Sequence, residues 1–230
     1  MYISRHGETY ANKERVNIGQ KLDPRVVLDE KGIEQARKLL DLLSDSGIQT
    51  IYVSELSRTH QTAEPLASQL KIVPEIRPNL NEMGFGHLEG LSADAPETRD
   101  NLRRIDSDCA YRFGGDGESR NDVQKRLKGL VSEIEKPGSP KIVMLVGHFG
   151  TVRGLLSLFL NASCQNAARI VPANTDLFRL TLVDGRVKLL ELSEDRKPFK
   201  SIKAVDLMKG RPPAGMLPAA GATSTAPKAP

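Results

Sequence analysis

The chain has 230 residues, of which 39% are hydrophobic, and this length suits one medium-sized domain with a substantial core. The formal net charge is +4, but Lys209, Arg211 and Lys228 supply three of those charges in a final stretch without acids. The body is therefore close to neutral, which gives no reason to expect nucleic-acid binding. No apolar run approaches the roughly 20 residues of a membrane span, and no secretion signal is recognisable.

The cysteine content is low. Only Cys109 and Cys164 are present, far apart in the sequence and without metal-site spacing. Reduced thiols in a cytoplasmic protein are the simplest interpretation. No other set of histidines, cysteines and carboxylates has the spacing of metal ligands, so we expect neither a metal nor another cofactor.

The predicted elements alternate along the chain. After the apolar run Met1-Tyr2-Ile3, short β-branched segments predict strands, and segments with an apolar stripe predict helices. The strands are expected at residues 49–53, 71–76, 141–146, 177–183 and 187–192. The helices are expected at residues 31–43, 58–70, 121–135 and 151–160. Asp29 and Ser57 are suitable N-caps for the first two helices, and Pro65 is a possible kink in the second.

This alternation predicts an α/β fold, a three-layer α/β/α sandwich with a mostly parallel sheet. Asp184-Gly185 is a hairpin signal, so the last two strands are expected to pair antiparallel at or near the sheet edge. We expect one domain over residues 1–208, in which the irregular segment 85–120 is a lid-like insertion over the carboxyl ends of the strands. Residues 209–230 are rich in proline and alanine and are expected to form a disordered tail.

The segment Arg5-His6-Gly7-Glu8-Thr9 lies at the exit of the first predicted strand. An imidazole there can act as a phosphoryl-accepting nucleophile, while a neighbouring guanidinium holds phosphate oxygens with forked donors. Four further pieces follow in order, beginning with Ser54-Glu55-Leu56-Ser57-Arg58-Thr59-His60. The others are Leu80-Asn81-Glu82-Met83-Gly84-Phe85-Gly86, Gly114-Gly115-Asp116-Gly117-Glu118-Ser119 and Val146-Gly147-His148-Phe149-Gly150.

Together these five pieces resemble the histidine phosphatase superfamily, which has the phosphoglycerate mutase-like fold, from Met1 to about Leu192. The resemblance implies that His6 is the phosphorylated nucleophile and Glu82 the proton donor. It also implies a phosphate pocket formed by other matching positions. These are Arg5, Asn12, Arg58, Gly147 and His148.

Electrostatics supports these roles. His6 must be neutral to attack phosphorus, and the like charges of Arg5 and Arg58 should lower its pKa. A backbone carbonyl is expected to fix the tautomer of its ring. Glu82 must be protonated to donate, and an adjacent phosphate dianion favours the neutral acid. His148 is expected as an imidazolium that stabilises charge on the equatorial phosphate oxygens.

Other polar residues have simpler explanations. His60 is expected to pack on a helix surface, and His87 is equally balanced between substrate contact and no role. Glu8 could cap, pair locally or act as a second carboxylate near the pocket. The glycines of the fourth piece fit a turn before a helix capped by Ser119 better than a phosphate contact. A solvated helix of mixed charge is favoured over a substrate-binding basic rim for four arginines: Arg99, Arg103, Arg104 and Arg112.

The leading hypothesis is a metal-independent phosphomonoester hydrolase that acts through a phosphohistidine. A phosphoglycerate mutase is the alternative, and the short segment 90–114 favours the phosphatase, because mutases of this family tend to be longer there. A non-catalytic phosphate- or phosphoprotein-binding module is a third possibility. The expected partner is a small phosphorylated substrate, with no nucleic acid and no membrane, and the sequence leaves the oligomeric state open.

Overall fold

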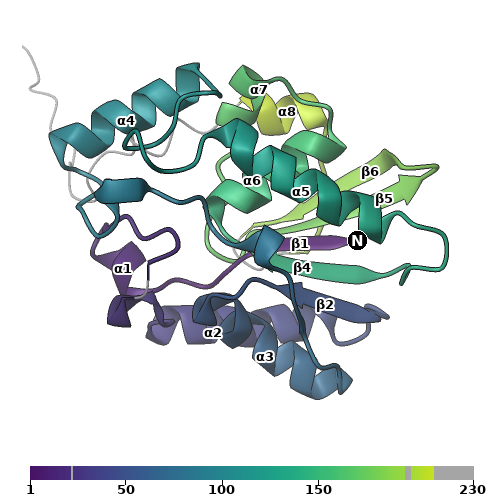
Figure 1. Ribbon diagram of the computed structural model, residues 1–230. Helices are drawn as coiled ribbons and strands as arrows, with labels where there is room; N and C mark the ends of the chain where they lie inside the picture. Colours follow the sequence, from purple (N-terminus) through teal and green to yellow (C-terminus); the bar gives the residue numbers. More distant parts are fainter. Residues whose placement is uncertain (22, 195–197, 210–230) are drawn as a thin grey trace, which may run out of the picture.

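The computed structural model describes residues 1–21, 23–194 and 198–209. Apart from Lys209, the expected tail over residues 209–230 lies outside the described residues. Within them the strands form one sheet in the order β3-β2-β4-β1-β5-β6-β7 (Figure 1). Their bounds are β1 (Tyr2–Arg5), β2 (Thr50–Val53), β3 (Glu75–Ile76), β4 (Val143–Gly147), β5 (Leu177–Val183), β6 (Arg186–Ser193) and β7 (Lys200–Ser201).

The sheet has a parallel part and an antiparallel part. Strands β3, β2, β4 and β1 are parallel, whereas β5, β6 and β7 continue the sheet antiparallel from β1. Asp184 and Gly185 join β5 to β6 with φ angles of 50° and 69°. Two successive positive φ angles are typical of the tight turn that suits strand twist. The predicted hairpin near the sheet edge is therefore confirmed.

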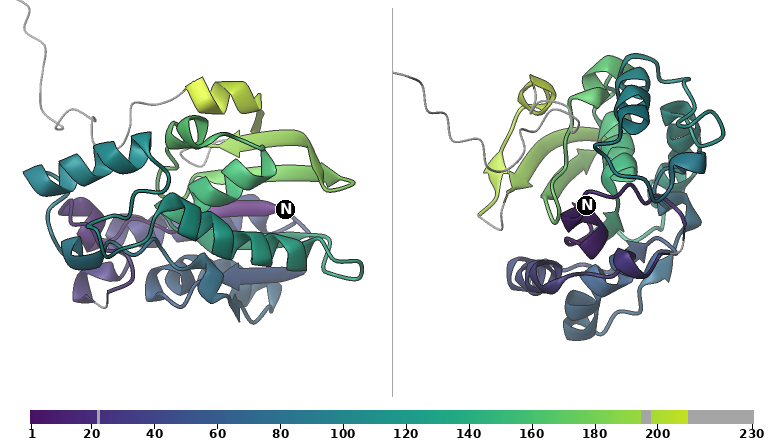
Figure 2. Two further views of the ribbon diagram at one scale, coloured as in Figure 1. Left: turned by 45° about the horizontal axis from the view of Figure 1, so that its top comes forward. Right: turned by 90° about the vertical axis from the view of Figure 1, so that its left-hand side faces the viewer.

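Helices cover both faces of the sheet. The described α-helices are α1 (Tyr10–Lys13), α2 (Glu30–Leu43), α3 (Ser57–Leu70), α4 (Pro96–Ser107), α5 (Arg120–Ile134), α6 (Phe149–Phe159), α7 (Cys164–Ala168) and α8 (Ala204–Lys209). Short 3₁₀ turns lie at Pro24–Val26, Pro78–Leu80 and Gly86–Leu88. Figures 1 and 2 show α2 and α3 on one face of the sheet and α5 and α6 on the other.

Alternating strand residues build the two cores between these layers. Tyr2 and Met144 pack with α2 and α3, whereas Ile3 and Leu145 pack with α5 and α6. Successive side chains of a strand point to opposite faces, so a fully apolar strand such as β4 serves both cores. The mixed α/β sandwich predicted from the sequence is confirmed.

Local chemistry explains the helix starts and one departure from the prediction. Asp29 caps α2 by accepting a hydrogen bond from the Gly32 amide, as expected. Ser57 is instead the first residue of α3, whose N-cap is Leu56 without a side-chain bond. The strand expected at residues 71–76 is reduced to Glu75–Ile76, because Lys71 ends α3 in the left-handed conformation and residues 72–74 belong to no regular element.

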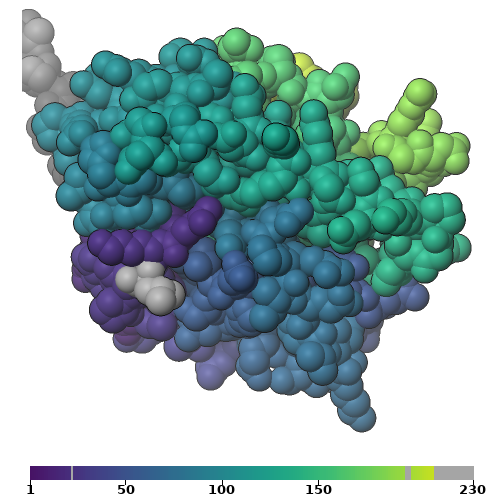
Figure 3. Space-filling view, viewed as in Figure 1, coloured from purple at the N-terminus to yellow at the C-terminus, as the bar shows by residue number. Residues whose placement is uncertain are grey.

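The segment 85–120 holds the 3₁₀ turn Gly86–Leu88, helix α4 and two loops. Its start is tied to the N-terminal loop through Glu89, whose carboxylate accepts from the amides of Gly19 and Gln20. In Figure 3 the purple N-terminal loop lies against the blue-teal surface of this segment. The N-terminal loop and the segment 85–120 are thus in contact, although they are far apart in the sequence.

The cysteines differ from the prediction. Cys109 and Cys164 form a disulfide that joins the segment after α4 to the start of α7, with their Cα atoms 6.1 Å apart. No sequence pattern indicates this proximity, since it arises from the docking of α4 beside α7. The expectation of reduced thiols is thus wrong for this structure, and the cytoplasmic prediction loses that support. Among the described residues, no helix has the length and apolarity needed to cross a membrane.

Candidate active site

Strands β1 and β4 end side by side at one edge of the sheet, and a histidine follows each of them. The amide of His6 donates to the carbonyl of Gly147 at 2.9 Å, which holds the two strand ends together. The imidazole rings of His6 and His148 then lie 5.1 Å apart, centroid to centroid. Carboxyl ends of parallel strands are the usual ligand edge of an α/β sheet, as the sequence predicts.

His6 is held as a neutral imidazole. The residue is 3% exposed, and its Nδ1 lies 2.7 Å from the Gly7 carbonyl oxygen. A carbonyl only accepts, so Nδ1 carries the proton and Nε2 keeps its lone pair. Burial first, and then the charges of Arg58 and Arg5, hold the pKa of His6 well below its usual value. The expected backbone carbonyl is confirmed.

The backbone beside His6 is fixed by close packing on α2 and α3. The Gly7 amide donates to the hydroxyl of Thr62 at 2.9 Å. A Cβ atom on Gly7 would lie 2.8 Å from the carbonyl oxygen of Gly32, so only glycine lets the loop approach α2 this closely. Both contacts restrict the position of the imidazole before any substrate arrives.

Buried Arg58 and partly buried Arg5 supply positive charge beside His6. Arg58 is 3% exposed and donates through Nη2 to the Gly19 carbonyl at 2.9 Å, while Arg5 donates through Nη1 to Pro172 at 3.0 Å. Burial lowers the pKa of Arg58 to about 10, so it stays charged at neutral pH. Nη1 of Arg58 and Nε of Arg5 are buried without a hydrogen-bond partner among the described residues. Buried donors of this kind are suited to an anion.

His148 differs from the sequence-based expectation. It is fully buried, and its Nδ1 accepts a hydrogen bond from Nε of Arg58 at 3.0 Å. The ring proton therefore sits on Nε2, which donates to the Ser54 hydroxyl at 2.8 Å. Burial and the charge of Arg58 hold the pKa of His148 well below its usual value. His148 is thus a neutral residue that orients Arg58, rather than the expected imidazolium.

Glu82, the predicted proton donor, is buried against the first turn of α6. It is 5% exposed, and its Oε1 accepts from the amides of Met83 at 2.8 Å and Gly150 at 2.9 Å. Burial raises the pKa of Glu82, and these hydrogen bonds and the nearby Arg58 only partly oppose that shift. The protein itself therefore favours the neutral acid, in addition to the effect expected from a bound phosphate.

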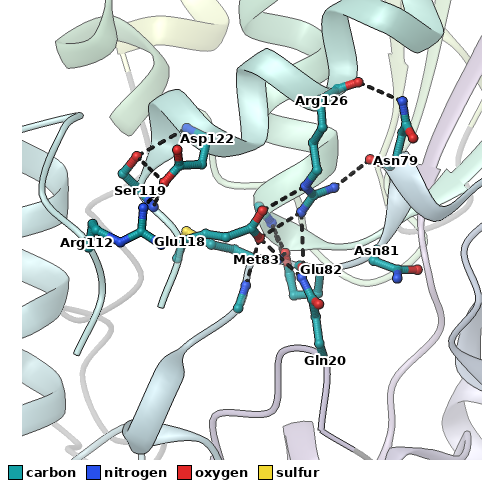
Figure 4. A network of polar contacts seen from close by, with 12 residues as sticks. Gln20, Asn79, Asn81, Glu82, Met83, Arg112, Glu118, Ser119, Asp122 and Arg126 are labelled. Carbon is teal, nitrogen blue, oxygen red and sulfur yellow. Dashed lines mark hydrogen bonds and ion pairs between the residues drawn. The ribbon is translucent and has the colours of Figure 1, made fainter. Parts of the chain in front are cut away.

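A network of polar contacts holds the main chain of Glu82 (Figure 4). Arg126 on α5 donates to the Glu82 carbonyl at 3.1 Å and forms an ion pair with Glu118 at 3.0 Å. Gln20 donates to the same carbonyl at 2.8 Å. The carboxyl group of Glu82 is consequently placed from two sides, by α6 through its side chain and by α5 through its backbone.

Asn12 and Gly147, two more predicted site residues, differ in whether they line the cavity. Asn12 lines the cavity, and its Oδ1 accepts from Nδ2 of Asn174 at 3.1 Å. Asn174 also donates to the carbonyl of His6 at 3.0 Å, a contact that no sequence pattern indicates. Gly147 acts through its backbone carbonyl on His6, and it is not among the described residues that line the cavity.

The structure gives Glu8, His60 and His87 local contacts outside the catalytic groups. Glu8 pairs with Lys31 at 2.8 Å, and Nε2 of His60 lies 2.7 Å from the Ser54 carbonyl. His87 is exposed between Asp116 and Glu97, and it does not line the cavity in the described part of the chain. The same acids raise the pKa of His87. Substrate contact by His87 is therefore unsupported.

The arginines around α4 form a solvated, mixed-charge surface. Arg99 pairs with Asp94 and Arg103 with Asp100, both as exposed ion pairs. Arg112 pairs with Asp122 in the first turn of α5, and the Arg104 guanidinium lies 5.7 Å from the Tyr111 ring centroid. Across residues 1–21, 23–194 and 198–209, none of the four arginines lines the cavity. The favoured interpretation from the sequence holds, and the basic rim is not seen.

One cavity of about 510 Å³ unites these groups. Its floor is the strand edge with His6, Arg5, Arg58 and Glu82, and its cover comes from the segment 85–120. A neutral imidazole, a carboxyl group with a raised pKa and the guanidiniums of Arg5 and Arg58 therefore line one cavity. Groups of these kinds are the ones that phosphoryl transfer through a histidine requires.

Comparison with known proteins gives the family. A sequence model of the histidine phosphatase superfamily (branch 1) matches residues 1–195. A probable phosphoglycerate mutase, GpmB of Yersinia pestis (strain Pestoides F), is 31% identical over 183 residues, which are 78% of this chain and 83% of that protein. The chain belongs to the histidine phosphatase superfamily.

Solved structures agree in fold. A mycobacterial glucosyl-3-phosphoglycerate phosphatase, solved with VO3, superposes with a TM-score of 0.68 at 30% identity, covering 79% of this chain and 92% of that one. A putative alpha-ribazole-5'-P phosphatase from Escherichia coli superposes with a TM-score of 0.72 at 23% identity, covering 85% of this chain and 96% of that one. The relatives therefore include both phosphatases and a probable mutase.

Proposed function

We propose that this protein is a metal-independent phosphomonoester hydrolase that acts through a phosphohistidine on His6. The observation that carries the proposal is the fixed tautomer of His6, which leaves Nε2 unprotonated in a residue that lines the same cavity as Glu82, Arg5 and Arg58. The likeness to a solved phosphatase at 30% identity supports the hydrolytic outcome.

The reaction has two balanced steps. In the first, Nε2 of His6 attacks phosphorus, the bond from phosphorus to the alcohol oxygen breaks, and Glu82 gives its proton to that oxygen. In the second, the Glu82 carboxylate takes a proton from water, whose oxygen attacks phosphorus while the bond to Nε2 breaks. Inorganic phosphate leaves, and both residues return to their starting forms.

The role of Arg5 and Arg58 is to stabilise the negative charge of the phosphoryl oxygens. Nη1 of Arg58 and Nε of Arg5 are the buried donors that can bind phosphoryl oxygens, and they strengthen as charge develops there in the transition state. His148 contributes by holding Nε of Arg58, which fixes the guanidinium plane. The positive charge that the reaction needs can thus come from the protein itself.

Phosphoglycerate mutase is the second candidate, because the probable mutase GpmB is 31% identical over 78% of this chain. The same phosphohistidine would then return its phosphoryl group to another hydroxyl instead of water. Two assays separate the candidates: phosphate release from 4-nitrophenyl phosphate, and interconversion of 3- and 2-phosphoglycerate. We expect release without comparable interconversion, and the opposite result would identify a mutase.

A further inference from the structure

The guanidinium of Arg58 is oriented from two sides. His148 accepts from its Nε, and the carbonyl of Gly19, in the loop 15–20 that follows α1, accepts from its Nη2 at 2.9 Å. Nη1 is left as a buried donor without a hydrogen-bond partner in the described part of the chain. Because a guanidinium is planar and rigid, the direction of Nη1 depends on where Gly19 lies.

The position of Gly19 depends in turn on a carboxylate of the segment 85–120. Glu89 accepts three backbone N–H groups: Oε2 accepts from Gly19 at 2.7 Å, and Oε1 accepts from Gln20 and from Phe85, each at 3.0 Å. Hydrogen bonds to a carboxylate are among the stronger ones in proteins. Glu89 therefore holds the residue whose carbonyl orients Arg58.

The loop and the segment 85–120 approach most closely at Gly19. A Cβ atom there would lie 2.2 Å from the Met83 carbonyl oxygen and 2.5 Å from Oε1 of Glu89, so no side chain fits between them. Further from the site, the amide of Asn17 donates to the Leu91 carbonyl at 2.9 Å. Backbone contact thus anchors the loop at Asn17, and the Glu89 carboxylate continues that contact to Gly19.

The charge of Glu89 and its position predict opposite effects on an anion. Burial lowers the pKa of Arg58, and the charge of Glu89 is among those that oppose this shift. By charge alone, a nearby carboxylate weakens the binding of phosphate, so its removal should strengthen binding. If Glu89 instead aims the guanidinium, its removal should weaken binding. The sign of the change therefore separates the two roles.

We propose that Glu89 is a positioning residue, which holds Gly19 and thereby directs the guanidinium of Arg58 toward the phosphoryl group. Glu89 does not itself line the cavity among the residues that the structure describes. The lid-like segment would then contribute to phosphate binding through the loop 15–20. This inference rests on the proposed function, since that function makes the phosphoryl group the ligand of Arg58.

Glu89→Gln tests this role with little change of shape. The amide NH2 group donates and cannot accept from a backbone N–H, so at least one of the three contacts is lost. We expect the dissociation constant of inorganic phosphate, measured by calorimetry, to rise by at least about three-fold, as for groups coupled in one hydrogen-bond network. An unchanged or lower constant would overturn the proposal.

Asp116→Asn is the matched control. Asp116 is a carboxylate of the same segment and also accepts a backbone N–H group, that of His87 at 3.0 Å. This substitution removes the same charge without touching the loop 15–20. The dissociation constant of phosphate should therefore not rise in Asp116→Asn.

A double-substitution cycle with Arg58→Lys separates positioning from a general loosening of the site. Lysine keeps a positive charge, so that phosphate still binds, but it lacks the forked guanidinium that Gly19 orients. In the Arg58→Lys protein, Glu89→Gln should raise the constant by less than about two-fold, because the coupled partner is gone. The same rise with arginine and with lysine at this position would overturn the proposal.

The Nε–H signal of Arg58 in nuclear magnetic resonance tests the same point without a substrate. Its absence in Arg58→Lys identifies it. In the unaltered protein this proton lies in the buried hydrogen bond to His148 and should exchange slowly with solvent. Glu89→Gln should make the exchange faster, and an unchanged rate would contradict the proposal.

Failure of the proposed function would look different. If the unaltered protein released no phosphate from 4-nitrophenyl phosphate, the hydrolase proposal would fail. Neither phosphate binding nor Nε–H exchange needs turnover, so both would still test Glu89. If Glu89→Gln does not fold, Glu89→Asp is measured in the same way, because it keeps the charge but is one methylene too short to reach all three amides.

Discussion

The strand-edge floor and the α4 lid of the cavity hold arginines in opposite ways. Arg58 on the floor is 3% exposed, donates to neutral groups and keeps one buried donor that has no partner within the described part of the chain. Arg103 on the lid has a side chain that is 69% exposed and pairs with the neighbouring Asp100. Buried guanidiniums without a carboxylate partner favour an external anion, whereas exposed ion pairs contribute little. Burial and ion pairing, rather than residue type, therefore distinguish an arginine suited to binding an anion from one on the solvated surface.

The largest expected effect is on the floor. His6→Ala should reduce turnover by at least about 10⁴-fold, as loss of a nucleophile does, and should abolish acid-labile labelling by a phosphorylated substrate. Phosphate release and labelling with a ³²P-substrate measure both effects. The control is His87→Ala, an exposed histidine outside the cavity lining, which should keep both. Retained labelling in His6→Ala would place the phosphoryl group elsewhere.

The second effect concerns the lid and its neighbour α7. The disulfide spans a sequence separation of 55 residues, so replacing both cysteines with serine should lower the free energy of unfolding by about 4 kcal/mol in the chain-entropy description. Denaturant titration of oxidised, reduced and Cys109→Ser/Cys164→Ser protein measures it. If reduction leaves the stability of the unaltered protein as it was, the cysteines are not paired in solution.

The third effect returns to the floor. Arg58→Ala should weaken binding of inorganic phosphate by roughly 1.5–3 kcal/mol, the scale of a hydrogen bond to a charged group. The inhibition constant of phosphate in the hydrolysis assay measures this loss. Arg37→Ala, at an exposed position of α2, is the matched control and should not change the constant. A constant that stays the same in Arg58→Ala would remove Arg58 from the phosphate site.

The dependence of kcat/KM on pH tests the protonation states of His6 and Glu82 on the floor. Since the pKa of His6 is lowered, the nucleophile stays unprotonated well below its usual titration range. Since the pKa of Glu82 is raised, kcat/KM should fall only above that raised value, by about ten-fold per pH unit where Glu82 is ionised. Phenyl phosphate, with its poor leaving group, makes this limb visible. Glu82→Gln should remove the alkaline limb, and its persistence would assign it to another group.

The smallest effect is on the lid surface. Arg103→Ala removes one exposed ion pair and should change the free energy of unfolding by less than about 1 kcal/mol. Thermal and denaturant unfolding measure it against the unaltered protein. A larger loss would show that the lid depends on its surface charges, and the contrast between the two regions would then be weaker.

The sequence predicts the parts of this protein that depend on local patterns. The apolar run of β4, the cap at Asp29 and the Asp184-Gly185 turn are readable because nearby residues determine them. The positions of His6, Arg58 and Glu82 in one cavity follow from the family resemblance. Nothing local indicates that Asn174 binds the His6 carbonyl or that Arg126 holds the Glu82 loop, since tertiary packing creates these contacts.

The state of His148 was also beyond the sequence. A histidine beside a phosphate site is expected to be charged, but the hydrogen bond from Arg58 needs its lone pair, and burial disfavours a second proton. The disulfide is a similar case, because cysteines distant in sequence meet only when α4 docks beside α7. Charge state and cross-links are properties of the folded neighbourhood.

The bond between Cys109 and Cys164 also ties α5, β4 and α6 into one covalent ring. The exposed turn around Lys136 lies within this ring, so a protease that cuts there opens the ring without releasing a fragment. A nicked molecule should therefore migrate as one band on a denaturing gel without reductant and as two bands with it.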